Sequence, residues 1–234
     1  MKTVILAGGK GVRLRPLTYT IPKPLLPIGE KPILEEIVER LKLQGFDDLI
    51  IAVGYRAELI ETYFRDGSQL GVQIDYVREA QALGTAGPLA LVRASFDLSA
   101  DEPLLVMNGD ILTDLDMRAL VEFHERGGFE LTVAMREFRL SHPYGVIETD
   151  GERVTRIEEK PTESDLVSAG IYILTRPVLD LVPSDRFFDM PDLVNALLAE
   201  KRSVGAYYFD DPWLAIDGME QLEDAARIIA ERHA

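Results

Sequence analysis

The sequence predicts an α/β fold with three layers, in which helices cover both faces of a mixed, mainly parallel sheet and a β-hairpin is inserted in the second half. Up to about residue 135, short apolar runs alternate with helical patterns, which is typical of a parallel sheet. Beyond residue 141, two strand patterns flank Asp150-Gly151, a favourable hairpin turn. Since no linker, repeat or low-complexity stretch divides the chain, we expect one domain over residues 1–234.

The elements of the first half follow from hydrophobic spacing. Residues 3–7 and 49–53 are short apolar runs of the kind that forms buried strands. Residues 16–32 contain too many prolines for a helix interior; Pro32 then opens a helix over 33–44, and Gly45 stands where its C-cap belongs. The same reasoning predicts a helix over 57–64, a strand over 72–77, a helix over 87–94, and a strand from 104 that runs into a glycine turn at 109.

In the second half the alternation of strands and helices is interrupted after residue 141. The patterns predict a helix over 117–126 and an extended segment over 131–135, and then the hairpin over 144–161. A strand over 169–175, a helix over 190–200, an extended segment over 204–209 and a helix over 219–230 complete the chain.

Composition and charge exclude several classes of function. A formal net charge of −15 repels polyanions, so we expect no nucleic-acid partner. The absence of cysteine excludes a disulfide framework, a cysteine zinc site and a cysteine nucleophile, and it fits a reducing cytoplasm. No stretch is long and apolar enough to span a bilayer. We therefore expect a cytoplasmic protein without a membrane partner.

The loop after the first strand carries the positive charge that the rest of the chain lacks. Between residues 2 and 31, six basic residues stand against Glu30 alone: Lys2, Lys10, Arg13, Arg15, Lys23 and Lys31. A local positive loop in an acidic chain suits a small anionic ligand.

The glycines of this loop do not fit the two familiar nucleotide motifs. Leu14 stands where the nicotinamide-binding turn needs its third glycine, and a Gly-Lys-Ser/Thr phosphate loop is absent. Gly8, Gly9 and Gly11 nevertheless let the backbone approach a ligand and offer N–H groups to an anion, while Arg13 adds a bidentate fork for phosphate. The loop therefore indicates a different kind of phosphate site; a plain tight turn would not explain its basic residues.

The stretch LAGGKGVRLRPLT followed by PKPLLPIGEKP resembles the signature of the sugar-1-phosphate nucleotidyltransferases, also called nucleoside-diphosphate-sugar pyrophosphorylases. The resemblance covers nearly the whole chain, through LGTAG (83–87), NGD (108–110), PYGV (143–146), EEKP (158–161) and AGIY (169–172). It implies a Rossmann-like fold with a catalytic domain over 1–234. It further implies magnesium-dependent transfer of a nucleotidyl group from a nucleoside triphosphate to a sugar 1-phosphate, and it suggests a homodimer.

The resemblance assigns roles by matched position. Arg13 would hold the departing phosphates, Lys23 would neutralise charge near the α-phosphate, and Asp110 would hold magnesium, although an aspartate after Gly109 can also simply form a turn. The implied nucleotide site comprises Leu6, Ala7, Gly8, Gly9, Gly11, Arg13, Glu79, Gly84, Thr85 and Asn108. The implied sugar-phosphate site comprises Gly145, Glu159, Lys160 and Ser168. For Glu159 the alternative is that it is simply a solvated residue of a strand.

Glu79, a short distance before ALGTAG (82–87), bears on the choice of base. The resemblance places Glu79 at the base, and a carboxylate only accepts hydrogen bonds. Guanine presents two adjacent donors and suits it, whereas uracil and thymine present one donor beside acceptors. LGTAG and NGDILTDLD also resemble the guanylyltransferase branch that acts on mannose or manno-heptose 1-phosphate. GTP is therefore favoured, and a uridylyl- or thymidylyltransferase stays open.

Two positions depart from the family pattern. Ser168 replaces the usual asparagine before AGIY, which puts the identity of the sugar in doubt. Ala215 stands where the family has the second magnesium ligand, and Asp217 follows two residues later. If that segment is extended, residues two apart share a face, so we expect Asp217 to supply the second carboxylate. The alternative is a non-catalytic relative that binds a nucleotide sugar without making it.

Overall fold

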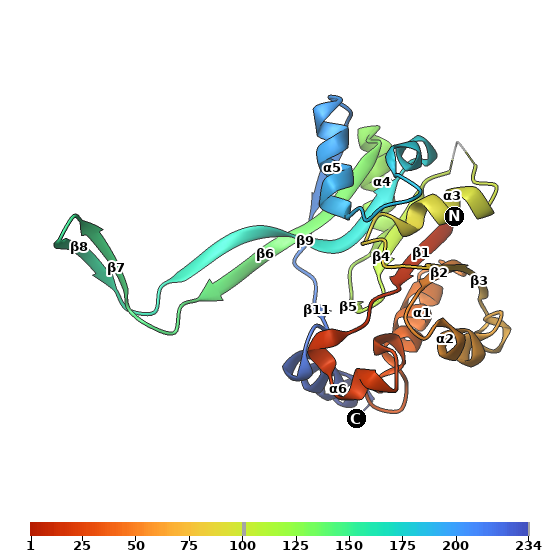
Figure 1. Ribbon diagram of the computed structural model, residues 1–234, viewed down its shortest axis with the longest axis horizontal. Helices are drawn as coiled ribbons and strands as arrows, with labels where there is room; N and C mark the ends of the chain where they lie inside the picture. Colours follow the sequence, from red (N-terminus) through yellow and green to blue (C-terminus); the bar gives the residue numbers. More distant parts are fainter. Residues whose placement is uncertain (100–101, 234) are drawn as a thin grey trace.

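A seven-stranded mixed sheet forms the centre of the protein (Figure 1), shown here by a computed structural model that describes residues 1–99 and 102–233. Its strand order is β10-β6-β9-β4-β1-β2-β3, and β9 runs antiparallel to both of its neighbours while the other pairings are parallel. The strands are β1 (Lys2–Ala7), β2 (Asp48–Val53), β3 (Gln73–Arg78), β4 (Leu104–Asn108), β6 (Leu131–Ser141), β9 (Thr162–Leu174) and β10 (Val204–Tyr208).

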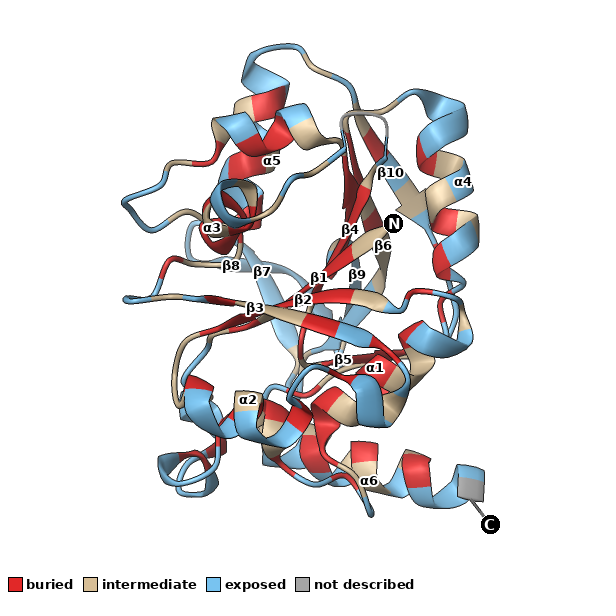
Figure 2. Ribbon diagram, turned by 90° about the vertical axis from the view of Figure 1, so that its right-hand side faces the viewer, coloured by how far each residue is buried: buried red, intermediate tan, exposed pale blue. Residues whose placement is uncertain are grey.

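Helices cover both faces of this sheet (Figure 2), as the sequence predicts. Alternate residues of one strand enter opposite cores: Ile5 of β1 packs in one hydrophobic cluster and its neighbour Val4 in the other. The first core takes side chains from α1 (Ile33–Leu43), α2 (Ala57–Phe64), α4 (Met117–Gly127) and α6 (Met219–His233), and the second from α3 (Pro88–Ser95) and α5 (Met190–Ala199). The predicted three-layer α/β architecture is thereby confirmed. Among the described residues, no helix combines the length and apolarity needed to cross a membrane.

The long loop between β1 and α1 is anchored to the body although it contains little regular structure. It passes through three short 3₁₀ turns, at Val12–Leu14, Leu17–Tyr19 and Lys23–Leu25, which agrees with the proline content that excluded a helix. Leu14, Leu26 and Ile28 are fully or almost fully buried in the core below. Leu14, which breaks the dinucleotide pattern, therefore anchors the loop in this core.

Strands β6 and β9 are longer than the sequence analysis predicts. The expected segments over 131–135 and 169–175 are only the parts that lie in the body; beyond Met135 and Ser168 the two strands continue to pair with each other as far as Ser141 and Thr162. They carry the predicted hairpin, β7 (Val146–Asp150) and β8 (Arg153–Glu158), at their far end (Figure 1). We call residues 136–167 the arm.

Candidate active site

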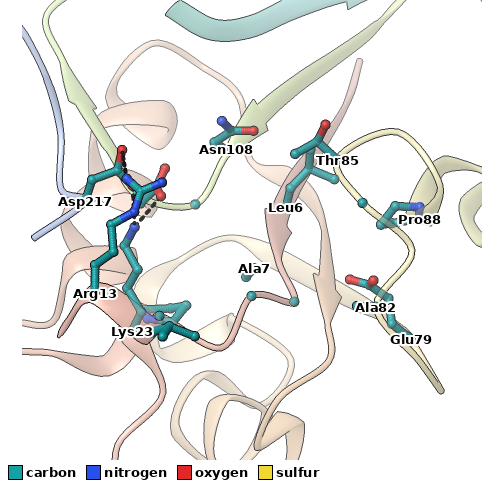
Figure 3. Close-up of a pocket in the computed structure, with 18 of the residues that line it drawn as sticks. Leu6, Ala7, Arg13, Lys23, Glu79, Ala82, Thr85, Pro88, Asn108 and Asp217 are labelled. Atoms are coloured by element: carbon teal, nitrogen blue, oxygen red, sulfur yellow. Dashed lines mark hydrogen bonds and ion pairs between the residues drawn. The ribbon is translucent and has the colours of Figure 1, made fainter. Parts of the chain in front are cut away.

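A pocket of about 460 Å³ opens where the carboxyl ends of β1 and β4 meet (Figure 3). This is the edge at which open α/β sheets place ligands, and the volume suits a small organic molecule. Every residue predicted for the nucleotide, for catalysis and for the metal lines this pocket: Leu6, Ala7, Gly8, Gly9, Gly11, Arg13, Lys23, Glu79, Gly84, Thr85, Asn108, Asp110 and Asp217. Sequence reasoning missed Val12, Pro24, Ala82, Pro88, Gly109 and Phe187, which complete the lining.

Two glycines of the first loop are required by close approaches. A Cβ added to Gly8 would lie 1.9 Å from Glu79 Oε1, so only glycine lets this carboxylate reach the floor of the pocket. Gly11 has a φ of 58°, and its Cβ would lie 2.9 Å from Thr18 Cγ2 and 3.0 Å from Lys23 Cβ. The Thr18 hydroxyl donates to the Gly11 carbonyl at 2.8 Å and fixes the turn. The glycines therefore set the distance between the loop backbone and the charged side chains.

Four charged side chains form one cluster at the loop end of the pocket. Lys23 Nζ lies 2.5 Å from Asp110 Oδ2 and 3.4 Å from Asp217 Oδ1, and Arg13 Nη1 lies 3.1 Å from Asp217 Oδ2. Asp110 follows β4, and Asp217 is brought beside it by β11 (Trp213–Ala215), which pairs antiparallel with β5 (Ile111–Thr113). The structure thus brings together the two carboxylates that the sequence analysis proposed as a pair.

The same cluster has the donors that a hard divalent cation needs. Mg²⁺ prefers carboxylate oxygens and usually keeps several ligands from water and phosphate. Asp110 and Asp217 offer such oxygens on either side of one ammonium group, and among the described residues no set of three or more metal-ligating side chains gathers anywhere. The site therefore fits an ion held by two carboxylates and by a bound phosphate chain, and Ala215 contributes nothing to it.

Glu79 lies at the other end of the pocket from this cluster (Figure 3). Its Oε2 accepts a hydrogen bond from the Leu83 backbone N–H at 3.0 Å, and burial raises the pKa of its carboxyl. One carboxylate oxygen is thus committed to the protein, while Oε1 faces Gly8. Glu79 and the charged cluster of Arg13, Lys23, Asp110 and Asp217 are placed at separate ends, as an elongated ligand with one polar and one anionic end would require.

The segment that carries Gly84 and Thr85 is tied to the start of α5. Thr85 donates from its backbone N–H and from its hydroxyl to Asp189 Oδ1, at 2.8 and 3.1 Å, and the hydroxyl accepts from the Met190 N–H at 2.8 Å. The Phe188 carbonyl accepts from the N–H groups of Ala86 and Gly87. The Thr85 hydroxyl therefore both donates and accepts within the protein, which ties this part of the pocket lining to α5.

The predicted sugar-phosphate residues are not gathered with the nucleotide residues. Gly145, Glu159 and Lys160 lie on the arm, and none of them lines the pocket, so their role at a sugar phosphate stays a prediction. From Met135 to Ser141 the arm advances six residues, or about 20 Å at strand rise, before the hairpin begins. Ser168 lies at the base of the arm, where its hydroxyl pairs with the Tyr172 hydroxyl at 2.8 Å.

An open α/β sheet with a glycine loop and paired carboxylates at its carboxyl edge is typical of nucleotide-binding proteins. Residues 2–232 match the family described as nucleotidyl transferase, and the chain belongs to that family. A UTP--glucose-1-phosphate uridylyltransferase of Synechocystis sp. is 36% identical over 249 residues, which cover 99% of this chain and 64% of the relative. A mannose-1-phosphate guanyltransferase of Yarrowia lipolytica is 41% identical over 187 residues, 78% of this chain and 51% of the relative.

Solved structures show the same architecture. HddC from Yersinia pseudotuberculosis superposes with a TM-score of 0.76 at 26% identity and covers 97% of this chain and 99% of its own. The same protein complexed with GMP-PN gives a TM-score of 0.75 at 25% identity, with the same coverage. The likeness confirms the Rossmann-like fold that the sequence resemblance implied. The chain spans 64% and 51% of the length of the Synechocystis and Yarrowia relatives.

Proposed function

We propose that the protein is a magnesium-dependent sugar-1-phosphate nucleotidyltransferase. The observation that carries the proposal is the cluster in which Lys23 lies between Asp110 and Asp217 directly beside the glycine loop and Arg13. Two cationic side chains and two carboxylates at the end of a nucleotide-sized pocket suit a reaction between two phosphate anions. Such a reaction needs positioning and charge neutralisation rather than a nucleophilic side chain.

The reaction is a substitution at the α-phosphorus of the triphosphate. An oxygen of the sugar 1-phosphate forms a bond to that phosphorus while the bond to the bridging oxygen of the β-phosphate breaks, and pyrophosphate leaves with the electron pair. Arg13 binds the departing phosphates, and Lys23 neutralises the charge that develops at the α-phosphate. A Mg²⁺ ion held by Asp110 and Asp217 would supply further neutralisation of the phosphate oxygens.

The proposed nucleotide is GTP. One carboxylate oxygen of Glu79 accepts from the Leu83 N–H, which leaves the other oxygen to accept from a ligand. Glu79 lies at the end of the pocket away from the charged cluster, and a base with adjacent donors suits this position. The guanyltransferase among the relatives and the GMP-PN complex of HddC support this choice, with mannose or heptose 1-phosphate as acceptor. The Synechocystis relative, matched over 99% of the chain, favours UTP with glucose 1-phosphate as the second candidate.

A grid of substrates tests the proposal. Pyrophosphate release is measured with each of GTP, UTP, dTTP and ATP against mannose, heptose and glucose 1-phosphates, with magnesium and with EDTA. We expect release in the GTP row that depends on both the sugar phosphate and magnesium. A UTP or dTTP row would overturn the choice of base, and no release in any cell would overturn the proposed activity itself.

A further inference from the structure

The ammonium group of Lys23 lies between the two carboxylates of the charged cluster. Its Nζ is 2.5 Å from Asp110 Oδ2 and 3.4 Å from Asp217 Oδ1, so one cation of the protein pairs with both acids (Figure 3). The Lys23 side chain is only 13% exposed, and salt screens such a pair less than it screens an ion pair on the surface. Lys23 therefore neutralises two carboxylates that would otherwise repel each other.

A divalent ion needs the same two oxygens. Mg²⁺ binds carboxylate oxygens at about 2.0–2.1 Å. An ion bound to both Asp110 Oδ2 and Asp217 Oδ1 would lie against Lys23 Nζ, because this nitrogen is within 3.4 Å of both oxygens. Two cations at such a separation repel each other strongly where little water lies between them. The pairing of Lys23 with the carboxylates and the binding of a bridging ion therefore exclude one another.

Lys23 can leave the carboxylates without a change in its backbone. It stands between Pro22 and Pro24, which are both buried and have fixed φ angles, and the Leu26 N–H donates to the Lys23 carbonyl at 3.0 Å. The side chain, in contrast, is a flexible aliphatic stem with a compact charge at its end. The ammonium group can therefore swing about a fixed point of the loop.

The stem of Lys23 starts beside the turn at which a phosphate chain is expected. A Cβ at Gly11 would lie 3.0 Å from Lys23 Cβ, and Gly11 and Arg13 line the same pocket. A triphosphate bound there would offer the ammonium group a second set of anionic oxygens. Arg13, which pairs with Asp217 at 3.1 Å, is 74% exposed, so this pair is weak and opens easily. A bound phosphate chain would thus draw both cations away from the carboxylates.

We propose that Lys23 is an internal counter-ion that keeps divalent metal ions away from Asp110 and Asp217 until a nucleotide binds. The phosphate chain takes up the ammonium group of Lys23, and the two carboxylates become available to the metal ion. Metal and nucleotide therefore strengthen each other's binding by the same factor. The inference rests on the proposed nucleotidyl transfer for the identity of the anionic ligand, and it gives Lys23 a role that charge neutralisation at the α-phosphate does not require.

The affinity for Mn²⁺ in the absence of nucleotide tests the exclusion. Mn²⁺ suits the same oxygen ligands as Mg²⁺, and its unbound fraction is measured by electron paramagnetic resonance. Lys23→Met removes the charge and keeps an unbranched stem. We expect this variant to bind Mn²⁺ at least about 10-fold more tightly than the wild type, because the competing cation is gone. A Lys23 that acts only during the reaction would leave this affinity unchanged.

Two further variants control this measurement. Lys10→Met removes the same charge from the same loop, but Lys10 is exposed and lies outside the charged cluster, so its Mn²⁺ affinity should stay within about twofold of the wild type. The double variant Lys23→Met/Asp110→Ala should lose the gain, since the ion then lacks one of its carboxylates. An equal gain in Lys10→Met, no gain in Lys23→Met, or a gain that survives in the double variant would each overturn the proposal.

Crystals of the wild type give a second test, which does not depend on the folding of any variant. With Mn²⁺ alone we expect no anomalous peak between Asp110 and Asp217. With Mn²⁺ and GTP, or UTP if the substrate grid selects it, we expect a peak there and Lys23 Nζ on a phosphate oxygen. A peak with Mn²⁺ alone, no peak with the nucleotide, or a peak beside a Lys23 that still contacts Asp110 would contradict the proposal.

The outcomes separate this role of Lys23 from the proposed reaction. A protein that shows these metal results but releases no pyrophosphate in the substrate grid would overturn the nucleotidyl transfer alone. A protein that is active in the grid but binds Mn²⁺ equally well with Lys23 and with methionine at this position would overturn the counter-ion alone.

Discussion

Replacing Gly84 with alanine should destabilise the protein more than its half-buried position beside the pocket suggests. Gly84 has a φ of 82°, and a Cβ there would lie 2.6 Å from the Phe188 carbonyl oxygen and 2.7 Å from Asp189 Oδ1. Both acceptors hold the segment after Gly84 through hydrogen bonds, so neither moves without breaking them. The left-handed conformation costs an alanine about 1–2 kcal/mol. The loss of even two of these hydrogen bonds adds about 1–3 kcal/mol.

The measurement is urea or thermal unfolding of Gly84→Ala against Gly128→Ala. Gly128 also has a left-handed φ, of 59°, but a Cβ there would meet no atom within 4 Å, so this variant reports the conformational cost alone. We expect Gly128→Ala to lower Tm by about 2–8 °C and Gly84→Ala by about twice that. Equal losses in the two variants would show that the contact with Phe188 and Asp189 carries no energy, and the reasoning would be wrong.

Three further predictions concern the pocket. Thr85→Val removes a donor to Asp189 and an acceptor for the Met190 N–H, and should lower the free energy of unfolding by about 1–3 kcal/mol in urea titration, whereas Thr85→Ser should cost less than half of that. Burial raises the pKa of Glu79 above its ordinary value of 4.5 in the folded state. As the pH rises from 4.5 through this raised pKa, the free energy of unfolding of the wild type should therefore fall relative to that of Glu79→Gln. Parallel curves of unfolding free energy against pH for the two proteins would contradict this. Asp217→Ala should lower kcat by at least about 100-fold and weaken the response to magnesium. The control Asp210→Ala, at an exposed position, should change neither. Unchanged kinetics in Asp217→Ala would show that Asp217 takes no part in the reaction.

Most of the pocket lining was predictable because its signals are local. The loop that carries the glycines and Lys23 follows the apolar strand β1, Asp110 follows β4, and the carboxyl ends of parallel strands meet at one edge of a sheet. Asp217 was predicted from the departure at Ala215, and the pairing of β11 with β5 explains how it arrives there. Phe187 gave no signal, since it reaches the pocket through the hydrogen bonds of the neighbouring Phe188 with Leu83, Ala86 and Gly87.

The arm was not predictable to its full length. Within it, the pairs of Phe138 with Asp165 and of Leu140 with Glu163 mix apolar and charged residues on one face, so no periodicity separates this part from a polar loop. The hairpin beyond it was predicted correctly, because Asp150-Gly151 and the strands beside it are local signals. Local patterns say which residues are extended, but they do not say whether a strand pair lies on the body or leaves it.

The fate of the α-phosphorus tests the central claim most directly. The wild type is incubated with magnesium, a sugar 1-phosphate and a nucleoside triphosphate that carries a radioactive α-phosphate, and the products are separated by chromatography. We predict that the label moves into a nucleotide sugar, in an amount equal to the pyrophosphate released, and that Lys23→Ala and Asp110→Ala abolish the transfer. Label that stays in the triphosphate, or that appears only in free mono- or diphosphate, would contradict nucleotidyl transfer in this pocket.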